Sequence, residues 1–249
     1  MKTTKYIFFL ALSALVTGCG YSRDERSPEK ESASYNICLI IDGTDRLDKQ
    51  QSIPEVGIDF VMELAEKIQS SGEGTLWLSW VDDNSENNSN AYLKILSAPV
   101  RMVSDKKMDY ETRIEYTKRV NMANEKFISD SIEFEKGKTA RFSKFRDDVQ
   151  SLLRLAYSEQ VARNRKGSDI NGAINLGIRL LNSIPKFDVC ENHLILVSDL
   201  VDNVGKSIVP DTDNISITSV NRSFSKHNLG GLVTKELGSL DQIFEYIFQ

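Results

Sequence analysis

The stretch Tyr35–Asp48, YNICLIIDGTDRLD, decides the fold. Its residues 37–41 form an unbroken apolar run, which is typical of a strand buried on both faces in the middle of a parallel sheet. The run ends at Asp42, and Thr44 and Asp45 follow it closely. Ligands of open α/β sheets bind outside the carboxyl ends of the strands, so the turn that begins at Asp42 is the first candidate site.

A second stretch, His193–Asn203, repeats this pattern in HLILVSDLVDN. An apolar strand again runs into polar residues, here Ser198 and Asp199. In a parallel sheet the carboxyl ends of the strands meet at one edge, where ligands bind. We therefore expect Asp42 and Asp199 to lie at the same edge of the sheet.

The rest of the chain alternates between strand and helix patterns. The expected elements are a helix over 56–68, a strand over 75–81, a shorter edge strand over 92–97, a helix over 170–184 that ends at Pro185, a strand over 215–220 and a helix over 237–248. This alternation predicts an α/β, Rossmann-like domain over residues 35–249, with a mostly parallel central sheet and helices on both faces.

Residues 101–166 interrupt that alternation. They contain no strand pattern, charged residues are dense, and the apolar residues of 142–156 recur at helical spacing. The sequence Lys136-Gly137-Lys138 is a plausible turn. We therefore expect an inserted helical hairpin whose apolar stripe packs on the sheet or on the sister helix.

The first 18 residues have the pattern of an export signal that is removed. Lys2 and Lys5 precede a short apolar run over 7–16, and small residues lead to Cys19. The run is too short for a transmembrane helix, which needs about 20 apolar residues. The sequence VTGC that ends at Cys19 resembles a bacterial lipoprotein box, which implies cleavage before this cysteine and its acylation. An ordinary secretory signal with a chance cysteine is the alternative.

Residues 19–34 contain few apolar side chains and are typical of a flexible tether between lipid and domain. Gly20, and not an aspartate, follows the cysteine. By resemblance to enterobacterial sorting rules, this implies an anchor in the outer membrane that faces the periplasm.

Composition excludes some classes of function. The chain of 249 residues has a net charge of −5 and no dense basic stripe, which argues against binding of nucleic acid. It contains no Gly-x-Ser-x-Gly nucleophile motif and no glycine-rich phosphate loop with lysine. We therefore expect no enzyme.

Two thiols remain if Cys19 is acylated. If Asp42 and Asp199 are level on neighbouring strands, Cys38 and Cys190 are offset by about five residues, or roughly 16 Å along the strands. That offset is beyond the reach of a disulfide. We expect Cys38 to be a buried free thiol.

Three loops resemble those of the von Willebrand factor type A domain. The first loop of that family reads Asp-x-Ser-x-Ser, and residues 42–46 read DGTDR. The second reads Gly-Thr-x-Ile-x-x-Ala-Leu, and residues 167–174 read GSDINGAI, with serine for threonine. The third reads Ser-Asp-Gly-x-x-Asn, and residues 198–203 read SDLVDN, with leucine for glycine. The resemblance implies a Rossmann-like fold with a metal-ion-dependent adhesion site at the carboxyl edge of the sheet.

The resemblance also implies the ligands of that site. Asp42, Thr44, Ser168 and Asp199 match the positions that hold Mg²⁺ or another divalent cation in the family. Mg²⁺ takes six oxygen ligands in near-octahedral geometry and keeps several waters. In the family a carboxylate of a partner protein completes this shell, so the resemblance implies a partner protein from the envelope or from outside the cell.

Arg46 departs from the family motif, because it stands where the family has its second serine. A guanidinium group offers only hydrogen-bond donors and cannot bind a cation. Three alternatives remain open. Arg46 points away while Asp45 or water fills the gap, or Arg46 itself neutralises Asp42 and Asp199 in place of the cation, or the loop binds nothing.

An enzyme is the main competing interpretation. Asp42-Gly43-Thr44 also resembles the haloacid dehalogenase phosphatases, whose nucleophilic aspartate stands two residues earlier. That position is Ile40 here, so no phosphoaspartate can form. We expect a lipid-anchored protein that binds another protein through a degenerate adhesion site. A degenerate phosphatase-like hydrolase and a structural envelope protein without a metal site are the alternatives.

Overall fold

The computed structural model describes residues 33–43, 53–102, 106–158, 167–184, 190–201, 204, 212–221 and 232–249. The export signal, Cys19, most of the tether, and Thr44, Asp45 and Arg46 of the first loop lie outside these ranges. Residues 32–249 form one compact unit. None of the helices in the described ranges is both long and apolar enough to cross a membrane.

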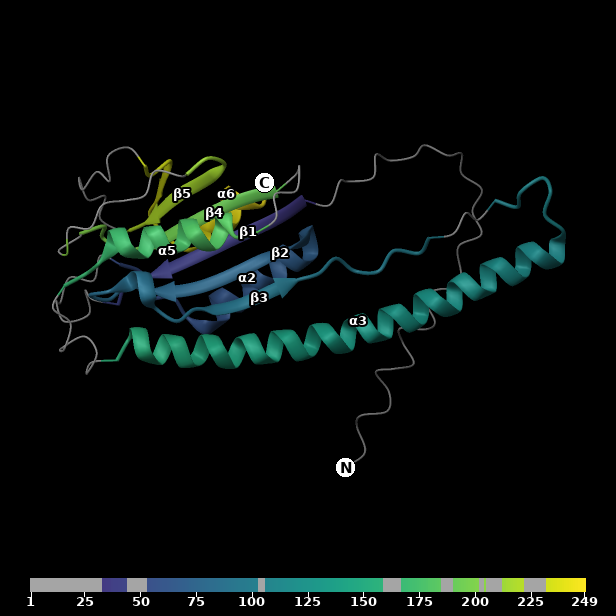
Figure 1. The fold of residues 1–249 in the computed structure, drawn as a ribbon, viewed down its shortest axis with the longest axis horizontal. Coiled ribbons are helices and arrows are strands. Elements are labelled where there is room, and N and C mark those ends of the chain that lie inside the picture. Colours follow the sequence, from purple (N-terminus) through teal and green to yellow (C-terminus); the bar gives the residue numbers. More distant parts are fainter. Residues whose placement is uncertain are drawn as a thin grey trace, which may run out of the picture. The chain divides into compact units, whose positions relative to one another are not determined.

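A sheet of six strands forms the centre of this unit, in the order β3-β2-β1-β4-β5-β6 (Figure 1). All neighbouring strands are parallel except β2 and β3. The strands are β1 (Ala33–Ile41), β2 (Gly72–Trp80), β3 (Ala91–Ile95), β4 (Cys190–Val197), β5 (Ile215–Val220) and β6 (Lys235–Leu237). The predicted mostly parallel sheet is confirmed, and β3 is the edge strand that the sequence predicts.

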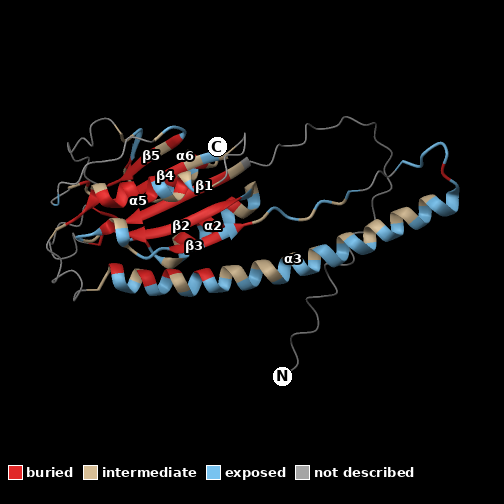
Figure 2. Cartoon of the chain, viewed as in Figure 1, coloured by how far each residue is buried: buried red, intermediate tan, exposed pale blue. Residues whose placement is uncertain are grey.

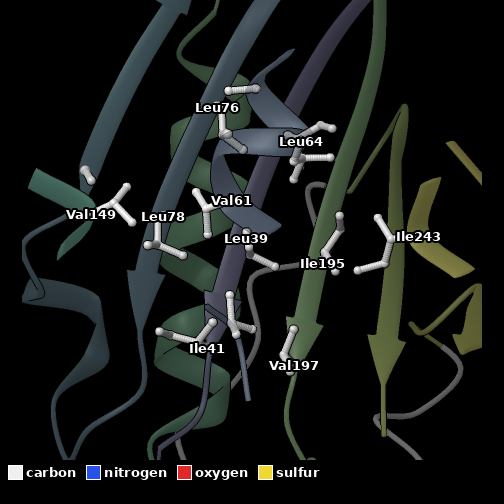
Figure 3. Packing of buried hydrophobic residues seen from close by; sticks show 14 of the residues in the cluster. Leu39, Ile41, Val61, Leu64, Leu76, Leu78, Val149, Ile195, Val197 and Ile243 are labelled. Atoms are coloured by element: carbon white, nitrogen blue, oxygen red, sulfur yellow. The ribbon is translucent and has the colours of Figure 1, made fainter. Parts of the chain in front are cut away.

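Helices cover both faces of the sheet, as predicted. They are α2 (Ile58–Ser71), α3 (Arg113–Ala156), α5 (Ile170–Asn182) and α6 (Asp241–Ile247), with one short 3-10 turn, η3 (Ser85–Asn87). Alternate side chains of a strand point to opposite faces of the sheet. Leu39 and Ile41 of β1 therefore lie in one core, with residues of α2, α3 and α6 (Figure 3). Cys38 and Ile40 lie in a second core, under α5.

The predicted helical hairpin is wrong, because α3 is one helix of 44 residues. Gly137 lies within it and does not adopt the positive φ that a helix-ending glycine commonly has. A glycine inside a helix costs only about 1 kcal/mol relative to alanine, and its neighbours are good helix formers. Thr112 and Glu115 form a capping box that fixes where the helix begins.

The buried residues of α3 all belong to its last third, namely Phe145, Val149, Leu152 and Ala156. The earlier part of the helix runs on beyond the sheet, and most of its surface is exposed (Figure 2). The apolar stripe predicted over residues 142–156 therefore packs on the core of the domain, as expected.

The predicted last helix begins four residues later than expected. Leu237 belongs to β6, and α6 starts at Asp241. Gly238 separates the two elements, and its N–H donates to the side chain of Gln242 at 2.8 Å. Leu237, at the end of the short strand β6, stands at helical spacing from the apolar residues that follow. The sequence pattern alone therefore could not separate the strand from the helix.

Cys38 and Cys190 are both free thiols, as expected. Cys38 lies opposite Leu194 and Cys190 opposite Ser34, so the two are four positions apart on neighbouring strands. Burial raises the pKa of the Cys38 thiol to about 12. This thiol is therefore neutral and unreactive at physiological pH.

Candidate functional site

The carboxyl edge of the sheet comprises the loops after β1, β2 and β4 and the loop before α5. The first loop, after β1, and the third loop, after β4, meet there. The N–H of Asp42 donates to the carbonyl of Val197 at 2.9 Å, so Asp42 is level with Ser198. The hydroxyl of Ser198 donates to Asp42 Oδ2 at 3.0 Å. Asp42 is only 4% exposed. The expectation that Asp42 and Asp199 share an edge is confirmed, with Ser198 as the direct neighbour.

The third loop turns sharply through hydrogen bonds of its own side chains. Ser198 Oγ accepts from the N–H of Leu200, and Asp199 Oδ1 accepts from the N–H of Val201, both at 2.9 Å. Leu200 has a φ of 63°, in the left-handed region that favours glycine. Glycine is the residue that the resembling motif has at this position. The side chain of Leu200 is buried in the core under α5, which compensates for the unfavourable backbone.

The second loop is tied to the same edge through Asp169, a residue that the sequence analysis did not single out. Asp169 is fully buried and caps α5, because its Oδ1 accepts from the N–H of Gly172 at 2.9 Å. Its Oδ2 accepts from the N–H of Ser85 at 3.0 Å. Its own N–H donates to the carbonyl of Asp82 at 2.7 Å. Asp82 lies two residues after β2, which neighbours β1, so Ser168 is brought to the edge that holds Asp42.

Gly172 allows the carboxylate of Asp169 to lie so close. A Cβ at Gly172 would be 2.1 Å from Asp169 Oδ2, so any side chain there would displace the cap. An aspartate directly before the first apolar residue of a helical pattern, as Asp169 is before Ile170, is an N-cap signal. The sequence alone could have identified Asp169 as an N-cap. It could not have predicted the hydrogen bond that Asp169 accepts from Ser85 in η3.

The first loop also contacts the end of α3. A Cβ at Gly43 would lie 2.2 Å from the carbonyl oxygen of Ala156. The hydroxyl of Tyr157 accepts from the N–H of Val56 at 2.9 Å, just before α2. The C-terminal end of the long helix is therefore fixed at the carboxyl edge, next to Asp42.

The donor set at this edge consists of oxygens. Asp42 and Asp199 supply carboxylates from neighbouring strands, and Ser168 supplies a hydroxyl from the loop before α5. Oxygen donors with two negative charges suit a hard cation such as Mg²⁺. Within the described ranges, no three side chains of His, Cys, Asp or Glu lie close enough together to hold a metal ion. A cation here would depend on hydroxyls and water beside the two carboxylates.

The sequence matches no protein-family model and no curated protein. The interpretation of the carboxyl edge therefore depends on the fold and on the side chains described above. Of the residues predicted for the site, Asp42, Ser168 and Asp199 lie at this edge. Thr44, Asp45 and Arg46 lie outside the described residues.

Proposed function

We propose that this protein is a lipid-anchored envelope protein with a type A-like domain. Its carboxyl edge binds another protein through a divalent cation. The observation that carries the proposal is the hydrogen bond from Ser198 to Asp42, which joins the first and third loops of the resembling motif at one edge. The second loop reaches the same edge through Asp169 and Asp82.

The left-handed backbone of Leu200 is an independent argument for the resemblance. The family motif has glycine at this position, and glycine is favoured there for a conformational reason. The loop adopts the backbone geometry that the glycine of the family motif favours, although leucine stands at this position. The shape directs Ser198 toward Asp42 and leaves Asp199 to bond the backbone two residues on.

Asp42, Ser168 and Asp199 are the described residues that would hold the cation, with Thr44 as a further ligand by resemblance. The cation would supply an electrophilic centre that a carboxylate of the partner protein completes. By the resemblance alone, Arg46 and Asp45 would contribute to partner contact or replace part of the positive charge.

Calorimetric titration with Mg²⁺ and Mn²⁺ tests the cation. We expect saturable binding of one ion by the protein, and loss of at least about tenfold in affinity for the Asp42→Asn variant, which removes one charge but keeps the shape of the side chain. The matched control is Asp130→Asn, because Asp130 is an exposed carboxylate on α3 outside the buried part of the helix.

Two results would contradict the proposal. Heats that do not differ between the protein and Asp42→Asn would exclude the edge as the cation site. An equal loss in Asp130→Asn would show that bound ions only screen surface charge. Thermal unfolding of both variants, measured alongside, shows whether a loss of binding reflects loss of the fold.

A further inference from the structure

The free end of α3 carries a surface that neither the fold nor the proposed binding edge uses. We call residues 106–122 the tip. Its most exposed large apolar side chains are Tyr110 at 84%, Ile114 at 81% and Met122 at 59%, and exposed apolar side chains continue along the helix at Ile128 and Ile132. Met102, which is 92% exposed, precedes the tip in the segment that leads to it. Large apolar side chains this exposed mark a contact surface when they cluster.

The tip is an ordered structure and not a frayed end. Glu111 accepts two hydrogen bonds from Arg119, at 2.8 and 3.0 Å. Arg119 also donates to the carbonyl of Lys106 at 3.2 Å. Arg101 donates to Asn124 at 2.7 Å, which holds the incoming segment along the first turns of the helix. The apolar side chains are therefore presented by a braced end of the helix.

The charge of the tip is opposite in sign to that of the whole chain. Residues 106–119 contain five basic and three acidic side chains, whereas the chain as a whole carries −5. Two of the acids are engaged locally, because Glu111 pairs with Arg119 and Glu115 caps the helix with Thr112. The basic residues Lys107, Arg113 and Lys118 are exposed. Apolar, aromatic and basic side chains together are typical of a surface that lies in the interface of an anionic membrane.

The topology places the tip and the start of β1 at the same side of the domain. The C-terminal end of α3 is at the carboxyl edge, beside Gly43, so the helix extends past the opposite edge, where β1 begins (Figure 1). A helix of 44 residues is about 66 Å long, whereas β1 with nine residues is about 30 Å. Roughly half of the helix therefore projects beyond the edge from which the chain continues toward Cys19.

The length of chain between Cys19 and β1 agrees with this arrangement. The 14 residue steps from Cys19 to Ala33 span at most about 50 Å. From Arg113 to Phe142, where packing on the core begins, the helix is about 43 Å long. An acylated Cys19 and the tip can thus reach one bilayer at the same time.

We infer that the tip of α3 is a second membrane contact, which docks on an anionic lipid surface and holds the carboxyl edge away from the bilayer. The inference rests on the lipid anchor of the proposed function. With the anchor in place, the tip binds at the high effective concentration that a short tether gives, so weak contacts suffice. The long helix then acts as a spacer that directs the binding edge away from the membrane.

Quenching by brominated lipids tests this contact. The lipidated protein with Tyr110→Trp is mixed with vesicles of brominated phosphatidylcholine and phosphatidylglycerol, and tryptophan emission and flotation are both measured. Trp77 and Trp80 are buried in the sheet and give a constant background. We expect quenching for Tyr110→Trp and none for the matched control Leu155→Trp, an exposed position at the other end of the same helix.

Charge variants test the lipid class. Each basic side chain near an anionic surface changes partitioning about fivefold, so Tyr110→Trp combined with Lys107→Gln and Lys118→Gln should lose most of its quenching. The same number of charges removed at the other end of the helix, by Lys144→Gln and Arg154→Gln, should leave it unchanged. Loss of quenching in vesicles without phosphatidylglycerol is also expected.

The two readouts separate failure of the anchor from failure of the tip. Flotation of the protein with the vesicles but without quenching of Tyr110→Trp would overturn the membrane contact of the tip and leave the anchor standing. The same result is expected if the tip binds a protein. A protein that does not float at all would overturn the anchor, and the second contact with it. Equal quenching of Tyr110→Trp and Leu155→Trp would show that the helix lies flat on the membrane, which contradicts the spacer.

Discussion

At the scale of single residues, Leu200 is the position where the backbone and the side chain favour different amino acids. Its φ of 63° is unfavourable for any residue with a Cβ, by about 1–2 kcal/mol. Its side chain is 6% exposed and packs under α5, and truncation of such a leucine costs about 2–5 kcal/mol. The loop keeps leucine because the burial outweighs the strain.

We therefore predict that Leu200→Gly destabilises the protein less than Leu200→Ala does, by about 1 kcal/mol, because only glycine relieves the strain. Chemical denaturation of both variants measures the difference. Leu196, a buried leucine in the regular strand β4, is the control, since glycine there should be the worse substitution. The same order at both positions would show that Leu200 is not strained.

The buried side chain of His193 should make the stability of the protein depend on pH. Its ring is 6% exposed, and burial lowers its pKa below the ordinary value of 6.5, against the opposing effect of Glu191, whose carboxylate lies 3.2 Å from Nε2. The imidazole of His193 is therefore harder to protonate in the folded protein than in the unfolded chain. The stability due to the neutral ring is complete above pH 6.5 and falls as the pH drops below that value.

The expected loss is at most about 1.4 kcal/mol per pH unit, because one proton is involved. Urea denaturation at several pH values between neutral and mildly acidic measures it. The His193→Gln variant should lose less stability on acidification than the unmodified protein does. A pH dependence that persists unchanged in His193→Gln would contradict the assignment.

At the scale of elements, α3 is the part of the fold that sequence patterns predicted least well. The turn expected at Lys136–Lys138 rested on one glycine between two charged residues. A turn there would have required two helices to pack on each other, but the buried residues of α3 begin only at Phe145. The strands were predicted better, because the apolar run of β1 is continuous and ends at Asp42, and Ile215–Val220 consists mostly of β-branched residues.

The single helix can be distinguished from the hairpin by Gly137→Ala. In a continuous helix alanine is favoured by about 1 kcal/mol, and its Cβ would meet only the flexible side chain of Arg141, at 3.1 Å. Amide exchange of the surrounding peptides should slow by about fivefold. The reverse change at an exposed position nearby, Ala140→Gly, should speed exchange by a similar factor. Faster exchange in Gly137→Ala would favour the turn.

At the scale of the whole molecule, the sequence predicted the sheet and one edge of it, but not how the loops are held there. Apolar runs that end in carboxylates located Asp42 and Asp199, because parallel strands deliver their ends to one edge. The bonds of Asp169 to Ser85 and Asp82 join segments about 85 residues apart in the chain. Local patterns contain no information on contacts of that kind, which depend on the packing of α5 against β1 and β4.

The carboxyl edge of the sheet and the N-terminal end of α3 lie at opposite ends of the domain. The carboxyl edge holds the proposed cation site, and α3 begins far beyond the opposite edge (Figure 1). The helix ends against Gly43, directly beside Asp42. The proposed binding edge therefore lies on the side away from the start of β1, from which the chain continues toward the proposed anchor.

The location of the cation tests the central claim most directly. Crystals of the protein grown with Mn²⁺ and measured at the manganese absorption edge would show an anomalous difference peak where the ion binds. We predict one peak at the carboxyl edge, within about 2–2.5 Å of oxygens of Asp42, Ser168 or Asp199 or of the waters that they hold. A map without a peak there, or with the ion bound elsewhere on the protein, would contradict the account.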